Sequence, residues 1–86
     1  MSKEVKVGEI VKYFAKPSVA AIKVTNGEIV LGDELHYKGA STDFSEVIET
    51  MEVDNKSVLK ALPGMLLGIK VNERVRPKDI VFKVLT

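Results

Sequence analysis

Apolar and polar residues alternate along most of the chain, which is typical of β-strands with one buried face. Composition supports this, because thirteen Val and six Ile stand against five Ala, and β-branched side chains suit strands better than helices. The alternation predicts strands over the ranges 5–15, 20–25, 28–31, 34–38, 44–54, 65–71 and 80–84.

Turn residues separate these runs. Asn26-Gly27 predicts a tight hairpin, and Pro63-Gly64 predicts a type II turn. Asp33 and Asp79 each precede a similar alternating strand, so we expect both side chains to accept hydrogen bonds from backbone amides of their turns. The charges within 44–54 follow no single period, which predicts a bulge near residues 48–50.

The alternation also assigns side chains to faces. It places Ile80, Phe82 and Val84 on the inward face of the last strand and His36 on an outward face. Gly68 has no side chain, which predicts the close approach of a neighbouring strand at that point.

Seven short strands between turns indicate an all-β fold. We predict a small closed or nearly closed antiparallel β-barrel of six to seven strands. The 86 residues leave room for a single domain, 1–86, because a chain of this length cannot divide its core.

Charge is unevenly distributed although the total is only +1. Residues 43–55 hold five acidic groups and no basic one, whereas residues 56–86 hold seven basic groups and two acidic ones. The acidic residues match no metal-binding loop and predict a solvated wall of the domain. The basic residues around the last connection form a candidate phosphate-binding set, Lys70, Arg74, Arg76 and Lys78. Ordinary solubilising charges, partly paired with Glu73 and Asp79, remain the alternative.

Little in the chain indicates catalysis. Cysteine is absent, and His36 is the only histidine, so we expect no metal site, no cofactor and no catalytic residue. A Ser-His arrangement with Ser41 or Ser45 lacks a nucleophile-elbow motif. Tyr13 and Phe14 are adjacent, so one of them should face outward. We see no signal peptide or apolar run of membrane-spanning length, and expect a cytoplasmic protein with no membrane contact.

The ordered series of short motifs resembles the β-barrel domain 2 of translational GTPases of the elongation factor Tu type. It is most similar to stand-alone translation elongation factor-like proteins, which also resemble the C-terminal barrel of U32 peptidases. The motifs are Val7-Gly8-Glu9-Ile10, Val30-Leu31-Gly32-Asp33-Glu34-Leu35, Ala61-Leu62-Pro63-Gly64 and Arg76-Pro77-Lys78-Asp79-Ile80. Where many members have Gly before the last Asp, this chain has Lys78, for which we expect a type I turn.

The resemblance implies a non-catalytic binding module that contacts tRNA or ribosomal RNA through the basic set. No phosphate-binding loop of the Gly-x-x-x-x-Gly-Lys type occurs, so we expect neither nucleotide binding nor GTPase activity. The similarity to the peptidase barrel implies the alternative, an accessory barrel that docks on a protein partner such as a U32-type peptidase.

Overall fold

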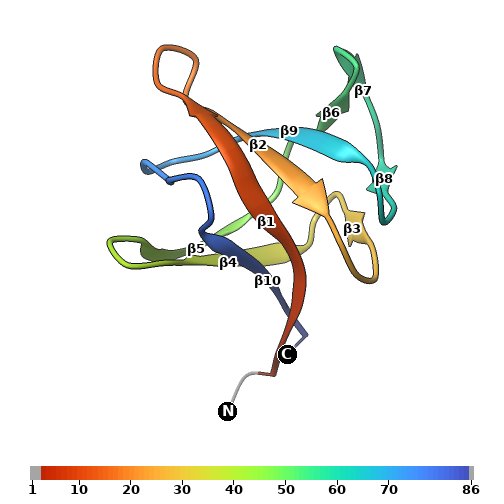
Figure 1. Cartoon of the computed structure of the whole chain (residues 1–86). Helices are drawn as coiled ribbons and strands as arrows, with labels where there is room; N and C mark the ends of the chain where they lie inside the picture. The colour runs from red at the N-terminus through yellow and green to blue at the C-terminus, as the bar shows by residue number, and fades with distance from the viewer. Residues whose placement is uncertain (1–2, 86) are drawn as a thin grey trace.

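The computed structural model describes residues 3–85, and all of its regular elements are antiparallel β-strands (Figure 1). Ten strands are present in that range: β1 (Glu4–Phe14), β2 (Val19–Val24), β3 (Ile29–Val30), β4 (Glu34–Lys38), β5 (Asp43–Val47), β6 (Glu52–Val53), β7 (Lys56–Ser57), β8 (Lys60–Ala61), β9 (Leu66–Lys70) and β10 (Ile80–Val84). The all-β prediction is confirmed. The predicted number of six to seven strands is wrong, because the run over 44–54 is interrupted and three two-residue strands lie between residues 52 and 61.

Eight strands form one large sheet in the order β5-β4-β10-β1-β2-β9-β6-β7, and β3 pairs with β8 in a small second sheet. The two ends of the large sheet are linked through the chain, because residues 48–51 run directly from β5 to β6. Within residues 3–85 no strand pairing joins β5 to β6 or β7. A closed barrel is therefore not confirmed, and the sheet is open at residues 48–51.

The core lies on the concave side of the large sheet. It consists of inward-facing residues from alternate strand positions and of residues in the connections. Examples are Leu35 and Tyr37 on β4, Leu67 and Ile69 on β9, and Ile48 after β5. Ile48 is also tied to the turn before β4, since its amide donates to the carbonyl of Asp33. The predicted bulge near 48–50 is thus a complete break in the strand, and it turns an apolar side chain into the core.

The predicted hairpin at Asn26-Gly27 is wrong. Gly27 does adopt a positive φ of 62°, and the amide of Asn26 donates to Val7. However, β2 pairs with β1 and β9, while β3 pairs with β8. The local turn chemistry is present, but long-range pairing decides where each strand goes.

The predicted inward face of the last strand is wrong. In β10 the buried residue is Val81, whereas Ile80, Phe82 and Val84 are half-buried. Both faces of this strand are apolar, so alternation alone does not fix its phase.

The expected close approach at Gly68 is not found, because a Cβ there would lie 3.8 Å from its nearest neighbours. It occurs instead at Gly8, where a Cβ would clash with the carbonyl oxygen of Lys23. Gly8 follows an irregularity in the pairing of β1 with β10, which brings its backbone close to β2.

The two Asp turns are confirmed. Oδ2 of Asp33 accepts from the amide of Val30 at 2.8 Å, and Oδ2 of Asp79 accepts from the amide of Arg76 at 2.9 Å. The turn before β10 is not of type I, because Lys78 has a φ of 78°, close to the 95° of Gly32 in the corresponding position. Pro63-Gly64 forms the expected turn, with a φ of 93° at Gly64. Across residues 3–85 no helix is long and apolar enough to cross a membrane.

Candidate functional site

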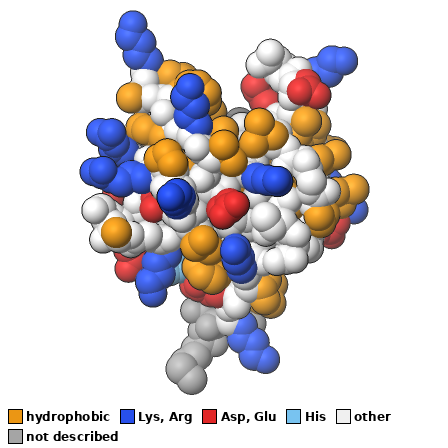
Figure 2. Space-filling view, viewed as in Figure 1, with side chains coloured by type: hydrophobic (Ala, Val, Ile, Leu, Met, Phe, Trp, Pro, Cys, Tyr) orange, Lys and Arg blue, Asp and Glu red, His pale blue; other side chains and the backbone are white. Residues whose placement is uncertain are grey.

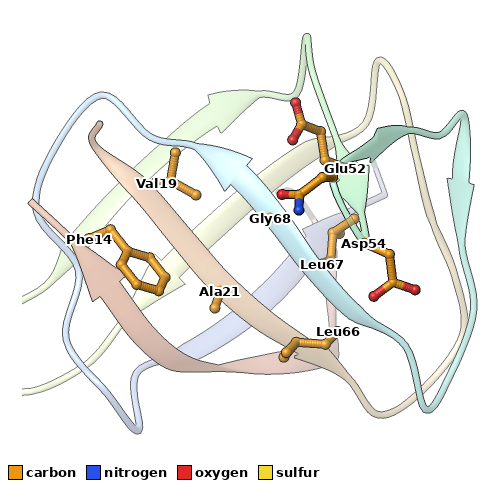
Figure 3. A pocket seen from close by; sticks show the side chains of 9 residues that line it. Phe14, Val19, Ala21, Glu52, Asp54, Leu66, Leu67 and Gly68 are labelled. Carbon is orange, nitrogen blue, oxygen red and sulfur yellow. The ribbon is translucent and has the colours of Figure 1, made fainter. Parts of the chain in front are cut away.

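One concave feature of the surface is an apolar hollow on the outer side of β2 and β9 (Figure 3). Its volume is about 260 Å³. In Figure 3, Phe14 lies on one side, Glu52 and Asp54 lie on the other, and Leu66 lies beyond Ala21. Figure 2 shows a notch between two projections, which correspond in Figure 1 to the β1–β2 connection and the β6–β7 hairpin.

Two large apolar side chains of this hollow remain open to solvent. Phe14 is 43% exposed and Leu66 is 55% exposed, and both line the same hollow. The ammonium group of Lys12 lies 5.0 Å from the centre of the Phe14 ring and covers part of it. The hollow therefore offers an apolar surface that the chain itself does not bury.

Two further hollows extend the first one along β9. The middle hollow shares Val19, Glu52 and Gly68 with the first, and it shares Thr50 and Lys70 with the last. Their volumes are about 230 Å³ and 410 Å³. The three hollows form one continuous depression, here called the β9 groove, which runs between β9 and the segment 46–55.

Carboxylates dominate the charges of the β9 groove. Four acidic side chains line it against the single cation Lys70: Glu46, Glu49, Glu52 and Asp54. Glu46 is already engaged, because it accepts from the amide of Asn72 at 3.0 Å and from the hydroxyl of Tyr37 at 3.3 Å. Burial raises the pKa of Tyr37, so its hydroxyl stays protonated as a donor.

The other three carboxylates have no ion pair or hydrogen bond within residues 3–85. The acidic segment is solvated, as its sequence predicts. Its arrangement along a groove was not predicted from the sequence. Two signals were available: one of Tyr13 and Phe14 had to face outward, and Leu66 interrupts the polar face of its strand.

The structure divides the predicted basic set. Lys70 ends β9 and lines the β9 groove, whereas Arg74, Arg76 and Lys78 lie on the connection 71–79, and all four side chains are exposed. No ion pair or hydrogen bond of these side chains occurs in the described part of the chain. Figure 2 shows Lys and Arg side chains on the side of the molecule where Figure 1 places this connection.

His36 faces outward, as predicted, and lies between two carboxylates. Its Nδ1 is 2.9 Å from Oε1 of Glu4, and its Nε2 is 2.6 Å from Oδ1 of Asp43. The hydrogen bonds to Asp43 and then to Glu4 raise the pKa of His36, and the bond to His36 lowers the pKa of Asp43. Both ring nitrogens are thus occupied, and neither is left to activate Ser41 or Ser45.

Acidic and histidine side chains do not gather into a metal site in the described range. No group of three or more such residues between residues 3 and 85 has the arrangement to hold a metal ion. The fold and the surface together define a small all-β domain with a groove suited to binding.

The sequence is similar to segments of two proteins that are named as proteases. No known family model matches the chain. It is 33% identical over 78 residues to a collagenase of Porphyromonas gingivalis, covering 90% of this chain and 22% of that protein. It is 31% identical over 81 residues to an uncharacterized protease of Methanocaldococcus jannaschii, covering 93% of this chain and 20% of that protein. The chain thus spans about a fifth of the length of the curated relatives it matches.

The structure is similar to a domain of a putative peptidase. The C-terminal domain of a putative U32 peptidase of Geobacillus thermoleovorans superposes with a TM-score of 0.85 at 22% identity, covering 91% of this chain and 90% of that one. Its selenomethionine variant gives 0.84 at 20% identity, with coverages of 90% and 96%. The fold is therefore that of a U32 peptidase C-terminal domain. These comparisons support the resemblance to the peptidase barrel, and they give no support to the resemblance to translation factors.

Proposed function

We propose that this protein acts as a non-catalytic accessory domain that docks on a peptidase of the U32 type. The observation that carries the proposal is the match of nine-tenths of the chain to about a fifth of a collagenase, together with the fold of a U32 C-terminal domain. The exposed apolar residues of the β9 groove provide a surface that a protein partner can cover.

A domain graft tests this proposal. The matching 78-residue segment of the P. gingivalis collagenase is replaced by this chain, and the chimera is compared with the parent, with a deletion, and with a graft of an unrelated small β-domain. We expect the chimera to keep most of the parent's collagen-degrading activity and the deletion and unrelated graft to lose it. This protein alone should not degrade collagen. A folded chimera no more active than the deletion would contradict the proposal.

A second candidate function is contact with tRNA or ribosomal RNA through the connection 71–79. The observation that favours it is the exposure of Arg74, Arg76 and Lys78 without partners among residues 3–85. Exposed cations on a protruding connection can contact phosphates without being buried.

Salt-dependent binding of labelled tRNA separates this candidate from the first. Changing Arg74 and Arg76 to Ala should lower the affinity and reduce the slope of its salt dependence by about one per cation removed. The matched control changes Lys23 and Lys56 to Ala, which removes the same charge from β2 and β7. Equal losses in both variants would show non-specific attraction and exclude the connection as the RNA site.

A further inference from the structure

The β9 groove has the length of a short extended peptide. Its lining runs from Leu66 in the first hollow to Asn72 in the last. Six residues of extended chain span about 20 Å. Along this length Phe14 and Leu66 lie in the first hollow opposite Glu52 and Asp54, and the last hollow is polar, with Glu46, Glu49 and Lys70.

β9 is an interior strand of the large sheet, but its two sides are paired to different extents. On the side of β2 the strand is paired from residue 66 to residue 70, but on the side of β6 it is paired only at Gly68, with Glu52. Elsewhere on that side no strand within residues 3–85 pairs with it. The groove therefore lies along the part of β9 that has no strand partner on this side, and the pair at Gly68 occupies the middle of that side.

We infer that the β9 groove binds an extended segment of polypeptide that carries Lys or Arg side chains and one large apolar side chain. The apolar side chain packs between Phe14 and Leu66, and the basic side chains face Glu49, Glu52 and Asp54. This inference rests on the proposed function in taking the partner to be a protein, and it deepens that function by giving the chemistry of the segment that is bound.

Charge favours a polypeptide over a nucleic acid in this groove. The lining holds four carboxylates and one ammonium group, and Lys12 adds a second ammonium group over the Phe14 ring. The excess of negative charge repels phosphates and attracts cationic side chains. Glu49, Glu52 and Asp54 are unengaged within the described range and can pair without breaking a bond of the domain. The large exposed side chains at the apolar end provide the contact that exposed ion pairs alone do not supply.

Fluorescence anisotropy with the full chain tests the inference. The probe is a labelled six-residue peptide in which Lys alternates with Leu, and its counterpart carries Glu in place of Lys. We expect the Lys peptide to bind, the affinity to fall with salt, and the Glu peptide to bind at least about tenfold more weakly. Nitrogen–proton correlation spectra should show peptide-dependent shifts within 14–21, 49–55 and 66–72.

Variants separate the apolar contact from the acidic one. Changing Phe14 and Leu66 to Ser should weaken peptide binding by more than about tenfold, because two apolar contacts are lost. The pair Glu52→Gln and Asp54→Asn should weaken it about three- to tenfold at low salt. Its matched control, Glu34→Gln and Glu73→Gln, removes the same charge outside the groove lining and should leave the affinity unchanged.

Several results would overturn the inference. Equal binding of both peptides, equal losses in the acidic variant and its control, or shifts confined to residues 71–79 would each exclude the groove as a basic-peptide site. Displacement of the peptide by tRNA, with the tRNA affinity lost in the groove variants, would assign the groove to RNA instead. If the peptide does not bind but the collagenase chimera is active, this inference alone is rejected. If the peptide binds but the chimera is inactive, the accessory-domain proposal alone is rejected.

Discussion

The β9 groove and the connection 71–79 carry opposite charges and are built in different ways. The floor of the groove consists of the paired strands β2 and β9, and its acidic side chains stand on the segment 46–55 beside them. The connection has no strand of its own, and inward residues hold it while its cations point to solvent. A formal charge of +1 therefore conceals two regions of opposite charge.

Buried residues and backbone hydrogen bonds fix the connection. Val75 is buried in the core, and Asp79 is only 5% exposed. Backbone hydrogen bonds tie its end to β1, from the amide of Lys78 to the carbonyl of Ile10 and from the amide of Ile10 to the carbonyl of Asp79. Because the floor of the groove lies on paired strands and the connection is held by buried side chains and turn hydrogen bonds, single changes should affect the two regions unequally.

The largest effect is expected at Asp79. Asp79→Ala leaves the amide of Arg76 without its acceptor at a buried position, and we expect the free energy of unfolding to fall by about 1–3 kcal/mol in urea titrations. Asp79→Asn keeps an acceptor oxygen and should lose less. Asp33→Ala should also lose less, because Asp33 is more exposed than Asp79. Identical losses in the Ala and Asn variants would show that the hydrogen bond is not what holds the connection.

Local chemistry explains what could be predicted from the sequence. Both Asp turns, the Pro63-Gly64 turn and the long first strand depend on neighbouring residues, and all are found in the structure. The partner of β3, the phase of β10 and the close approach at Gly8 depend on distant strands. Periodicity contains no information on those contacts.

The candidate site shows the same division. The exposure of Arg74, Arg76 and Lys78 follows from their place in a polar connection, and the sequence predicts it. The groove arises because Phe14, Leu66 and Asp54, which are far apart in the chain, meet on one surface. Each of these residues alone is typical of an ordinary strand or turn, so no single motif could indicate the site.

The next effect is expected at Lys78, which adopts a positive φ of 78° in the turn that closes the connection. L-residues other than Gly are strained in this region, and Lys78→Gly should raise the free energy of unfolding by about 0.5–1 kcal/mol. Lys78→Ala is the matched control, because it removes the same charge but keeps the Cβ atom. An equal gain in both variants would attribute the change to charge rather than to backbone strain.

A smaller effect on stability is expected in the floor of the groove. A Cβ at Gly68 would lie 3.8 Å from the carbonyl oxygen of Glu52, which is an ordinary contact. Gly68→Ala should therefore change the free energy of unfolding by less than about 0.5 kcal/mol, while it makes the groove shallower and weakens peptide binding. Gly8→Ala is the contrasting control and should cost about 1–3 kcal/mol, because its Cβ meets the backbone of Lys23. A large loss at Gly68 would show that the groove floor has no room for a methyl group.

The smallest effect is the pH dependence of the stability that His36 contributes. His36 and its two carboxylate partners, Asp43 and Glu4, lie outside both regions. The pKa of His36 is raised above 6.5 by Asp43 and Glu4, so its contribution to stability is complete below about pH 6.5 and is lost as pH rises through the folded-state pKa. The lowered pKa of Asp43 keeps its carboxylate charged at the acidic side of this range. The difference in unfolding midpoint between the wild type and His36→Gln should therefore shrink from pH 6 to pH 8. The wild type and His36→Gln should bind the peptide with equal affinity at each pH, because none of His36, Asp43 and Glu4 lines the β9 groove. If the two proteins instead differ in peptide affinity in parallel with their difference in stability, His36 and the groove are coupled through β5 and residues 48–51. The two charged regions would then not be independent.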